Sequence, residues 1–242
     1  MMNELLDHLM VWLQGNPWLG LLLTMGVFYG TQWVYHRFNS MPLLHPVLLS
    51  ILVIIMLLLF FDVNYEQYIQ GGQVVHFLLG PATVALAWPL YQNFKSIKKI
   101  WLPVLLAVTS GVLVGATSAI YLAQWFGADV LTQLSLAPKS VTTPVAIAVV
   151  EKIGGLPALT AGFVIITGVI GAMFGATVFK WMGIHNEQIK GIAMGVSAHG
   201  VGTARAWQLN PVMGAHSGLA MTVSALLIAF ILPPWLALLG LI

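Results

Sequence analysis

Long apolar runs separated by short polar links constrain this chain more than any other feature of its sequence. A helix needs about 20 apolar residues to cross the hydrocarbon core of a membrane. Six segments meet this requirement: Pro17–His36, Leu43–Phe61, Gln73–Gln92, Trp101–Phe126, Leu156–Trp181 and Val212–Leu239. The links between them, such as RFNSM and GIHNEQ, are too short to hold a separate soluble domain. The sequence therefore predicts an all-α polytopic membrane protein with one integral membrane domain over residues 1–242.

Composition supports this fold class and excludes several functions. The chain is 59% hydrophobic and 7% charged, with a mean hydropathy of +0.93, which the surface of a soluble domain does not tolerate. A net charge of +2 without a basic run argues against nucleic acid as a partner. The absence of cysteine excludes disulfides and thiolate sites, and the seven histidines lack metal-ligand spacing. With no nucleophile elbow or phosphate-binding loop either, we expect no metal, no cofactor and no enzyme activity.

Charge placement orients the predicted spans. With the N-terminus outside and the first four segments spanning, the basic links fall in the cytoplasm and the acidic links outside, as the positive-inside rule prefers. The residues concerned are Arg37, Lys95, Lys98 and Lys99 inside and Asp62, Glu66 and Asp129 outside. We expect residues 1–75 to form an N-terminal two-helix part that serves as a scaffold or dimer region, and residues 76–242 to form the core.

Two further apolar segments fit poorly as spans. Pro138–Lys152 would rise only about 22 Å as a helix, and Pro138 suits the first turn of that helix. If this segment crossed the membrane, Lys180 and Lys190 would fall outside; if it enters and returns, they fall inside with the other basic links. By the same reasoning Gly191–Leu209 enters from the cytoplasmic side. We therefore predict two re-entrant or broken segments that approach the midplane from opposite faces.

Internal similarity suggests an inverted repeat. Leu78–Phe94 resembles Ser135–Lys152, and GVLVGAT at Gly111–Thr117 resembles GAMFGAT at Gly171–Thr177, in the same order. In the predicted topology the helices that hold the two sevenmers run in opposite directions, as in many secondary transporters. Chance similarity between helices rich in Gly and Ala is the alternative. Glycines spaced four apart in these helices predict close helix packing rather than a ligand site.

Donor groups crowd the start of the first broken segment, in APKSVTTPVA. Lys139, Ser140, Thr142 and Thr143 are the donors. A helix N-terminus carries unpaired N–H groups and about half a positive charge, so it can hold a carboxylate. Lys139 and the hydroxyls would complete an anion site. In the alternative interpretation Lys139 only extends to the interface, and the hydroxyls bond back to the backbone.

The second broken segment contains HGVGTARA. Gly200 and Gly202 predict unwound backbone at membrane depth, with the helix resuming near Thr203. A charged side chain at the bilayer centre costs at least about 2.5 kcal/mol, so His199 and Arg205 there imply a polar pathway. The alternative is a cytoplasmic amphipathic loop in which Arg205 obeys the positive-inside rule. We also consider Glu151 and His216 as coupling residues; interfacial anchoring is the alternative for Glu151.

Several of these motifs together resemble one family. PATVALAWPLY, LAPKSVTTPVA, HGVGTARA and GAHSGLAM are similar to segments of the LrgB/CidB family of bacterial membrane proteins, which includes the membrane part of a plastid glycolate/glycerate transporter. The resemblance extends from Leu78 to Pro234. It implies a bacterial inner-membrane location. Some family members carry an acidic residue shortly after the arginine, where this chain has Trp207 and Gln208.

The resemblance implies two different functions. One is antiholin-like or holin-like control of murein hydrolases and cell lysis, together with a small LrgA/CidA-like membrane protein. The other is transport of small monocarboxylates such as pyruvate, glycolate or glycerate. A holin-like pore has no need of paired broken segments or buried cations. We therefore expect an elevator-like transporter of a small organic anion, working by alternating access as a homodimer. Its expected substrate-binding residues are Lys139, Ser140, Thr142, Thr143, His199, Gly200, Gly202, Thr203 and Arg205.

Overall fold

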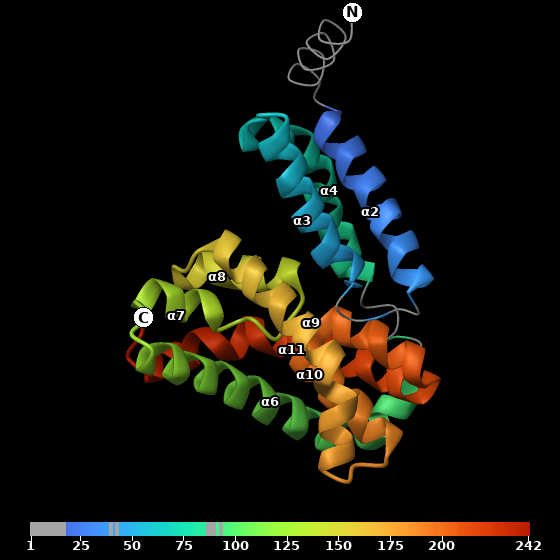
Figure 1. Cartoon of the computed structure of the whole chain (residues 1–242). Helices are drawn as coiled ribbons and strands as arrows, with labels where there is room; N and C mark the ends of the chain where they lie inside the picture. The colour runs from blue at the N-terminus through green and yellow to red at the C-terminus, as the bar shows by residue number, and fades with distance from the viewer. Residues whose placement is uncertain (1–17, 39–40, 42–43, 86–90, 92–93) are drawn as a thin grey trace, which may run out of the picture. The chain divides into compact units, whose positions relative to one another are not determined.

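The computed structural model describes residues 18–38, 41, 44–85, 91 and 94–242, and within these residues every regular element is a helix (Figure 1). The chain divides into two compact units, Met1–Ala82 and Thr83–Ile242. The helices are α2 (Leu19–Arg37), α3 (Pro46–Phe60), α4 (Tyr65–Ala85), α6 (Phe94–Trp125), α7 (Val130–Leu136), α8 (Thr143–Ile153), α9 (Pro157–Trp181), α10 (Glu187–Leu209) and α11 (Pro211–Leu238).

Hydroxyl groups join the helices of the first unit. The Thr31 hydroxyl on α2 lies 2.8 Å from the Ser50 hydroxyl on α3 and donates to the Pro46 carbonyl at 3.2 Å. A second contact joins α2 to α4, where the Thr24 hydroxyl lies 2.8 Å from that of Tyr68. Large apolar side chains such as that of Phe60 point outward, 81% exposed. Polar contacts inside and apolar side chains outside are what helices packed in lipid require.

Among the described residues, three helices are long and apolar enough to cross a membrane: Trp101–Trp125, Pro157–Trp181 and Pro211–Leu238. Each has at least 25 residues, a rise of about 38 Å, against a hydrocarbon core of about 30 Å. The helix α3 is apolar but has 15 residues. The structure therefore supports a helical membrane protein, as the sequence predicts.

Two predicted boundaries are wrong. The link that precedes Gln73 was expected to be a loop, whereas α4 begins at Tyr65, because Asn64 accepts a hydrogen bond from the Glu66 amide and starts the helix. Its predicted end near Gln92 falls partly outside the described residues. The helix α6 begins at Phe94, seven residues before Trp101, so that the basic KSIKK link forms its first turns.

The second unit packs around α6 and α11, which lie side by side (Figure 1). Fully buried side chains at helical spacing, such as Val108 and Val112 on α6 and Ile228 and Leu232 on α11, belong to one apolar core. The indole of Trp235 on α11 donates to the Thr117 hydroxyl on α6 at 2.9 Å. This core gives α7, α8, α9 and α10 a common base.

The first broken segment is a short helix, a loop and a second short helix. Asp129 caps α7 by accepting from the Thr132 amide, and α8 begins at Thr143. The predicted helix start at Pro138 is wrong: residues 137–140 form turns and residues 141–142 are not helical, with the Val141 amide donating to the Pro138 carbonyl. Pro144 instead takes the early helical position that favours proline.

Candidate functional site

The helix α10 is a hairpin of two helical arms, residues 187–198 and 200–209, that meet at His199. His199 has φ 40° and ψ −134°, a conformation that helices do not contain. Gly195 on the first arm lies against the Ser217 backbone, and the Thr203 hydroxyl on the second arm lies 2.9 Å from the Ser217 hydroxyl. Both arms thus contact the same residue of α11, which requires the chain to reverse at His199.

The two arms approach each other closely at Gly202. A methyl group there would lie 3.0 Å from the Met194 carbonyl oxygen, although residues eight apart in one straight helix lie about 12 Å apart. The predicted break is therefore confirmed, but not at the predicted residues. His199 takes the non-helical conformation, and Gly200 and Gly202 are helical. Gly202 is required because a side chain would not fit between the arms.

The tip of the hairpin lies against the middle of α9. The His199 side chain is 4% exposed, and its Nε2 lies 2.8 Å from the carbonyl oxygen of Val164. A carbonyl only accepts, so Nε2 carries the proton in this bond. Gly168 admits the imidazole ring, because a methyl group there would lie 2.6 Å from it. The alternative of an exposed amphipathic loop is therefore wrong for the tip.

A serine on α7, Ser135, holds the start of α9 close to the end of α6, where the first broken segment begins. Ser135 on α7 accepts from the Leu156 amide at 2.8 Å, and its carbonyl accepts from the Thr160 hydroxyl at 2.8 Å. The Ala128 amide bonds to the Ala123 carbonyl at the end of α6. Only α7, which rises about 10 Å, therefore separates the end of α6 from the start of α9.

Hydrogen-bond donors without partners lie in the loop between α7 and α8. The Ser140 and Thr142 hydroxyls are buried and have no hydrogen-bond partner among the residues that the structure describes. Lys139 is half-buried, and no carboxylate in the described part of the chain pairs with it. Such groups are costly to bury unpaired. The alternative in which these hydroxyls bond back to the backbone therefore does not hold for Ser140 and Thr142.

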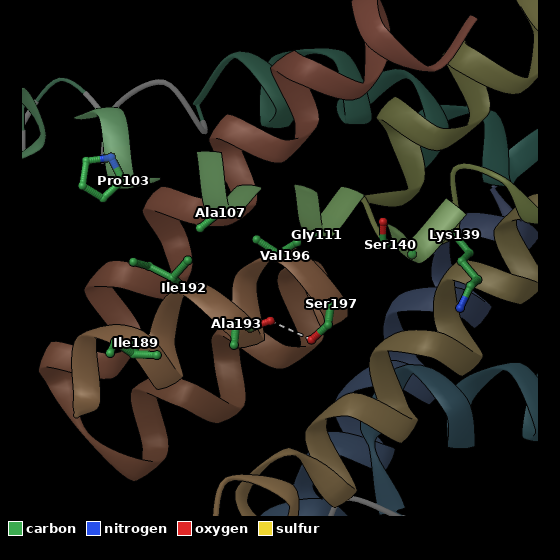
Figure 2. Close-up of a pocket in the computed structure, with 11 residues that line it drawn as sticks. Pro103, Ala107, Gly111, Lys139, Ser140, Ile189, Ile192, Ala193, Val196 and Ser197 are labelled. Atoms are coloured by element: carbon green, nitrogen blue, oxygen red, sulfur yellow. Dashed lines mark hydrogen bonds between the residues drawn. The ribbon is translucent and has the colours of Figure 1, made fainter. Parts of the chain in front are cut away.

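A cavity of about 560 Å³ connects this loop with α6 and the first arm of α10. Figure 2 shows Lys139 and Ser140 at one end of the lining and Pro103 and Ile189 at the other. The remaining lining residues are mainly small or apolar: Ala107, Gly111 and Gly115 from α6 and Ile192, Ala193, Val196 and Ser197 from α10. The cavity thus has one cationic, hydroxyl-bearing end and apolar walls.

The other predicted site residues do not line this cavity. Arg205 donates to the Gln208 side chain at 3.0 Å on its own arm, while its buried Nε has no partner. Thr203 bonds to the His199 carbonyl at 2.7 Å. Glu151 is exposed near the end of α8, and His216 Nδ1 lies 2.8 Å from the Val212 carbonyl oxygen. The structure thus brings Lys139 and Ser140 to the cavity and leaves the His199 to Arg205 group on the hairpin. Glu151 and His216 as coupling residues stay predictions.

Sequence reasoning missed the walls of the cavity. The small residues Ala107, Gly111 and Gly115 recur every fourth position along one face of α6. This spacing was the available signal, but it was interpreted as helix packing. That interpretation holds in part, because a methyl group at Gly111 would lie 2.7 Å from Val196, whereas Gly115 faces open space.

Fold and site together define a class: a helical membrane protein in which a hairpin helix and a polar loop border one cavity. The chain belongs to the LrgB-like family, whose pattern matches residues 24–238. It is 39% identical to "Uncharacterized protein YxaC" of Bacillus subtilis (88% of this chain, 92% of the relative). It is 33% identical to "Holin-like protein CidB" of Staphylococcus epidermidis (89% and 93%) and 30% identical to that of Staphylococcus aureus (89% and 93%). No solved structure matches the chain.

Proposed function

We propose that this protein carries a small organic monocarboxylate, of the pyruvate, glycolate or glycerate class, across the bacterial inner membrane. Lys139, Ser140 and Thr142 carry this proposal: one cation and two buried, unpartnered hydroxyls lie together at the start of α8. A carboxylate accepts hydrogen bonds from all of these groups, and the positive end of the helix dipole adds to the attraction. The ligand that would satisfy the loop is therefore a small anion.

The arrangement of the broken segments supports alternating access. We count α2, α3 and α4 as spans beside α6, α9 and α11, as the sequence predicts. With a re-entrant α7–α8 segment and the α10 hairpin, this proposed topology follows the charge rule, with Lys180 and Lys190 inside. In this topology α6 and α10 both begin at the cytoplasmic face, so Pro103 and Ile189 lie at the cytoplasmic end of the cavity. Lys139 would then hold the anion near the midplane in an inward-facing state.

The apolar walls restrict the substrate. Ile192 and Val196 offer no hydrogen-bond partner, and Ser197 uses its hydroxyl on the Ala193 carbonyl at 2.7 Å. A second charge on the substrate would therefore be unpaired at the walls. We infer that the carrier selects anions with one carboxylate and a small uncharged body. A homodimer with the first unit as scaffold, and elevator-like movement of the second unit, complete the proposal. An LrgA/CidA-like protein is a proposed partner.

Uptake into proteoliposomes tests this function. Purified protein reconstituted without partners should take up labelled pyruvate or glycolate saturably. Lys139→Ala should lower uptake by about ten- to a hundredfold, the value of a lost charge-assisted hydrogen bond. Lys152→Ala is the matched control, since Lys152 is exposed in the last turn of α8, the helix that follows the Lys139 loop. Equal uptake by both variants would contradict the proposed anion site.

A holin-like function is the second candidate, and it is favoured by the relatives named holin-like protein CidB. A pore would release unrelated solutes such as sucrose and a neutral dye at rates that rise without saturation. A carrier would retain both while it moves monocarboxylates. Measuring sucrose and pyruvate in the same vesicles therefore separates the two candidates, and equal, unsaturable passage of both would favour the pore.

A further inference from the structure

A second cavity, of about 370 Å³, lies at the turn between α9 and α10 and shares no residue with the first. Lys180, His185 and Lys190 form its basic part, and Glu187 is the one acidic residue in its lining. Phe179 and Met213, together with Ala176 and Ile184, form an apolar part. The cavity therefore joins cationic groups and hydrocarbon surface within one depression.

The charges in this cavity do not cancel. Lys190 Nζ pairs with Glu187 Oε1 at 2.6 Å, which fixes the position of that lysine. Lys180 has no ion-pair partner in the described part of the chain, and it stands in the last turn of α9. Asn210 adds a carboxamide to the lining, with its oxygen bonded to the Val212 amide at 2.8 Å. A net positive charge remains to attract an anion.

The end of α9 has the side chains of a membrane interface. Trp181 is 81% exposed and follows Lys180 directly, and tryptophan and lysine at the end of a span are typical of headgroup level. Phe179 is 7% exposed and forms part of a small buried cluster beneath this surface. Basic pockets between helices at this depth suit phosphate headgroups, with apolar surface left for the attached glycerol and acyl carbons.

We infer that this second cavity binds a phosphate group, with Lys180 and Lys190 as its cationic contacts, and that an acidic phospholipid supplies it. The apolar part favours a lipid over a soluble phosphate, because a free phosphate would leave that surface without a partner. Since this site is separate from Lys139, its occupancy is expected not to depend on the transported anion.

Thermal unfolding of the detergent-solubilised full chain tests the inference. Short-chain phosphatidylglycerol should raise Tm saturably, and phosphatidylcholine with the same acyl chains should not. The double variant Lys180→Gln/Lys190→Gln should bind phosphatidylglycerol roughly 25-fold more weakly, or fivefold per lysine, since one interfacial cation provides about that attraction. Lys152→Gln, which removes a lysine outside this cavity, should bind normally.

A single variant and two further ligands complete the test. If the double variant does not fold, Lys180→Gln alone serves, because Lys180 is exposed and unpaired, and it should show the fivefold loss. Equal stabilisation by phosphatidylcholine, or unchanged affinity in the Lys180→Gln variant, would overturn the inference. Glycerol phosphate that stabilises as well as the lipid would keep the phosphate site but overturn the phospholipid as its source. Lys139→Ala that loses transport but keeps lipid binding separates the two sites.

Discussion

The two broken segments of the second unit differ in how they satisfy their polar groups. At the tip of the α10 hairpin, His199 bonds to the Val164 carbonyl and Thr203 bonds to Ser217. In the loop between α7 and α8, the hydroxyls of Ser140 and Thr142 have no partner in the described part of the chain. Buried polar groups that are satisfied fix a fold, whereas unsatisfied donors are available to a ligand. The contacts at the tip therefore favour a structural role for that part of the hairpin, and the proposed function places binding in the loop. Arg205 Nε, on the second arm, is the exception on the hairpin, because it is buried without a partner among the described residues.

Close packing of the hairpin on α11 gives the largest expected effect on stability. In Gly195→Ala the new methyl group would overlap the Ser217 carbonyl oxygen, and we expect a loss of about 1 to 3 kcal/mol in the free energy of unfolding. Gly26→Ala is the control, because Gly26 has open space around it. Thermal unfolding in detergent measures both. A Gly195→Ala protein as stable as the control would contradict the close packing of the hairpin on α11.

A pair of serine variants tests the comparison directly. Ser217→Ala removes the partner of the Thr203 hydroxyl and should lower stability by about 1 kcal/mol, with uptake per folded protein unchanged. Ser140→Ala removes a hydroxyl that has no partner, so stability should not fall, while uptake should drop by about five- to tenfold. Unfolding curves and initial uptake rates distinguish the two. The reverse pattern would assign binding to the hairpin.

A variant in the cavity wall gives the smallest effect. Val196→Thr keeps the shape of the side chain and adds one hydroxyl at the cavity. Glycerate has hydroxyl groups that pyruvate lacks, and the new threonine hydroxyl could bond to one of them. The preference for glycerate over pyruvate should therefore rise by about two- to fivefold, the value of one modest hydrogen bond. Competition between the two anions for uptake measures this ratio. An unchanged ratio would mean that the substrate does not reach Val196.

Much of the fold could be predicted from the sequence, because a membrane span is recognised by the length of its apolar run and does not require a pattern of alternating polar and apolar faces. The predicted segments Leu156–Trp181 and Val212–Leu239 match α9 and α11 to within a residue at each end. A break in this segment was also predicted, from the cost of placing Gly200 and Gly202 in a helix, although both glycines are helical in the structure. Its position was not. The bond that holds the tip comes from Val164, far away in the sequence, so no local pattern identifies His199 as the turning residue.

Two of the predicted site residues, Lys139 and Ser140, line the larger cavity. They stand out in the sequence because several donors follow one another in KSVTT, although both lie in the loop before α8 and not in the helix that was predicted to begin at Pro138. Whether a donor already has a hydrogen-bond partner depends on tertiary contacts, which the sequence does not show. These contacts determine which motif has donors left for a ligand. HGVGTARA is the more conspicuous motif, yet the described contacts of Thr203 are internal ones. The first copy of the possible repeat lies partly outside the described residues, so the inverted repeat stays a prediction.

The link between α10 and α11 is a single residue, Asn210, whose side-chain oxygen accepts from the amides of Val212 and Met213. A one-residue link leaves the two helices little freedom to move independently. A movement of the hairpin is therefore coupled to α11, and the hydrogen bond from Trp235 to Thr117 connects α11 in turn to α6. If the proposed carrier works by moving the hairpin, α10, α11 and α6 are therefore expected to move together.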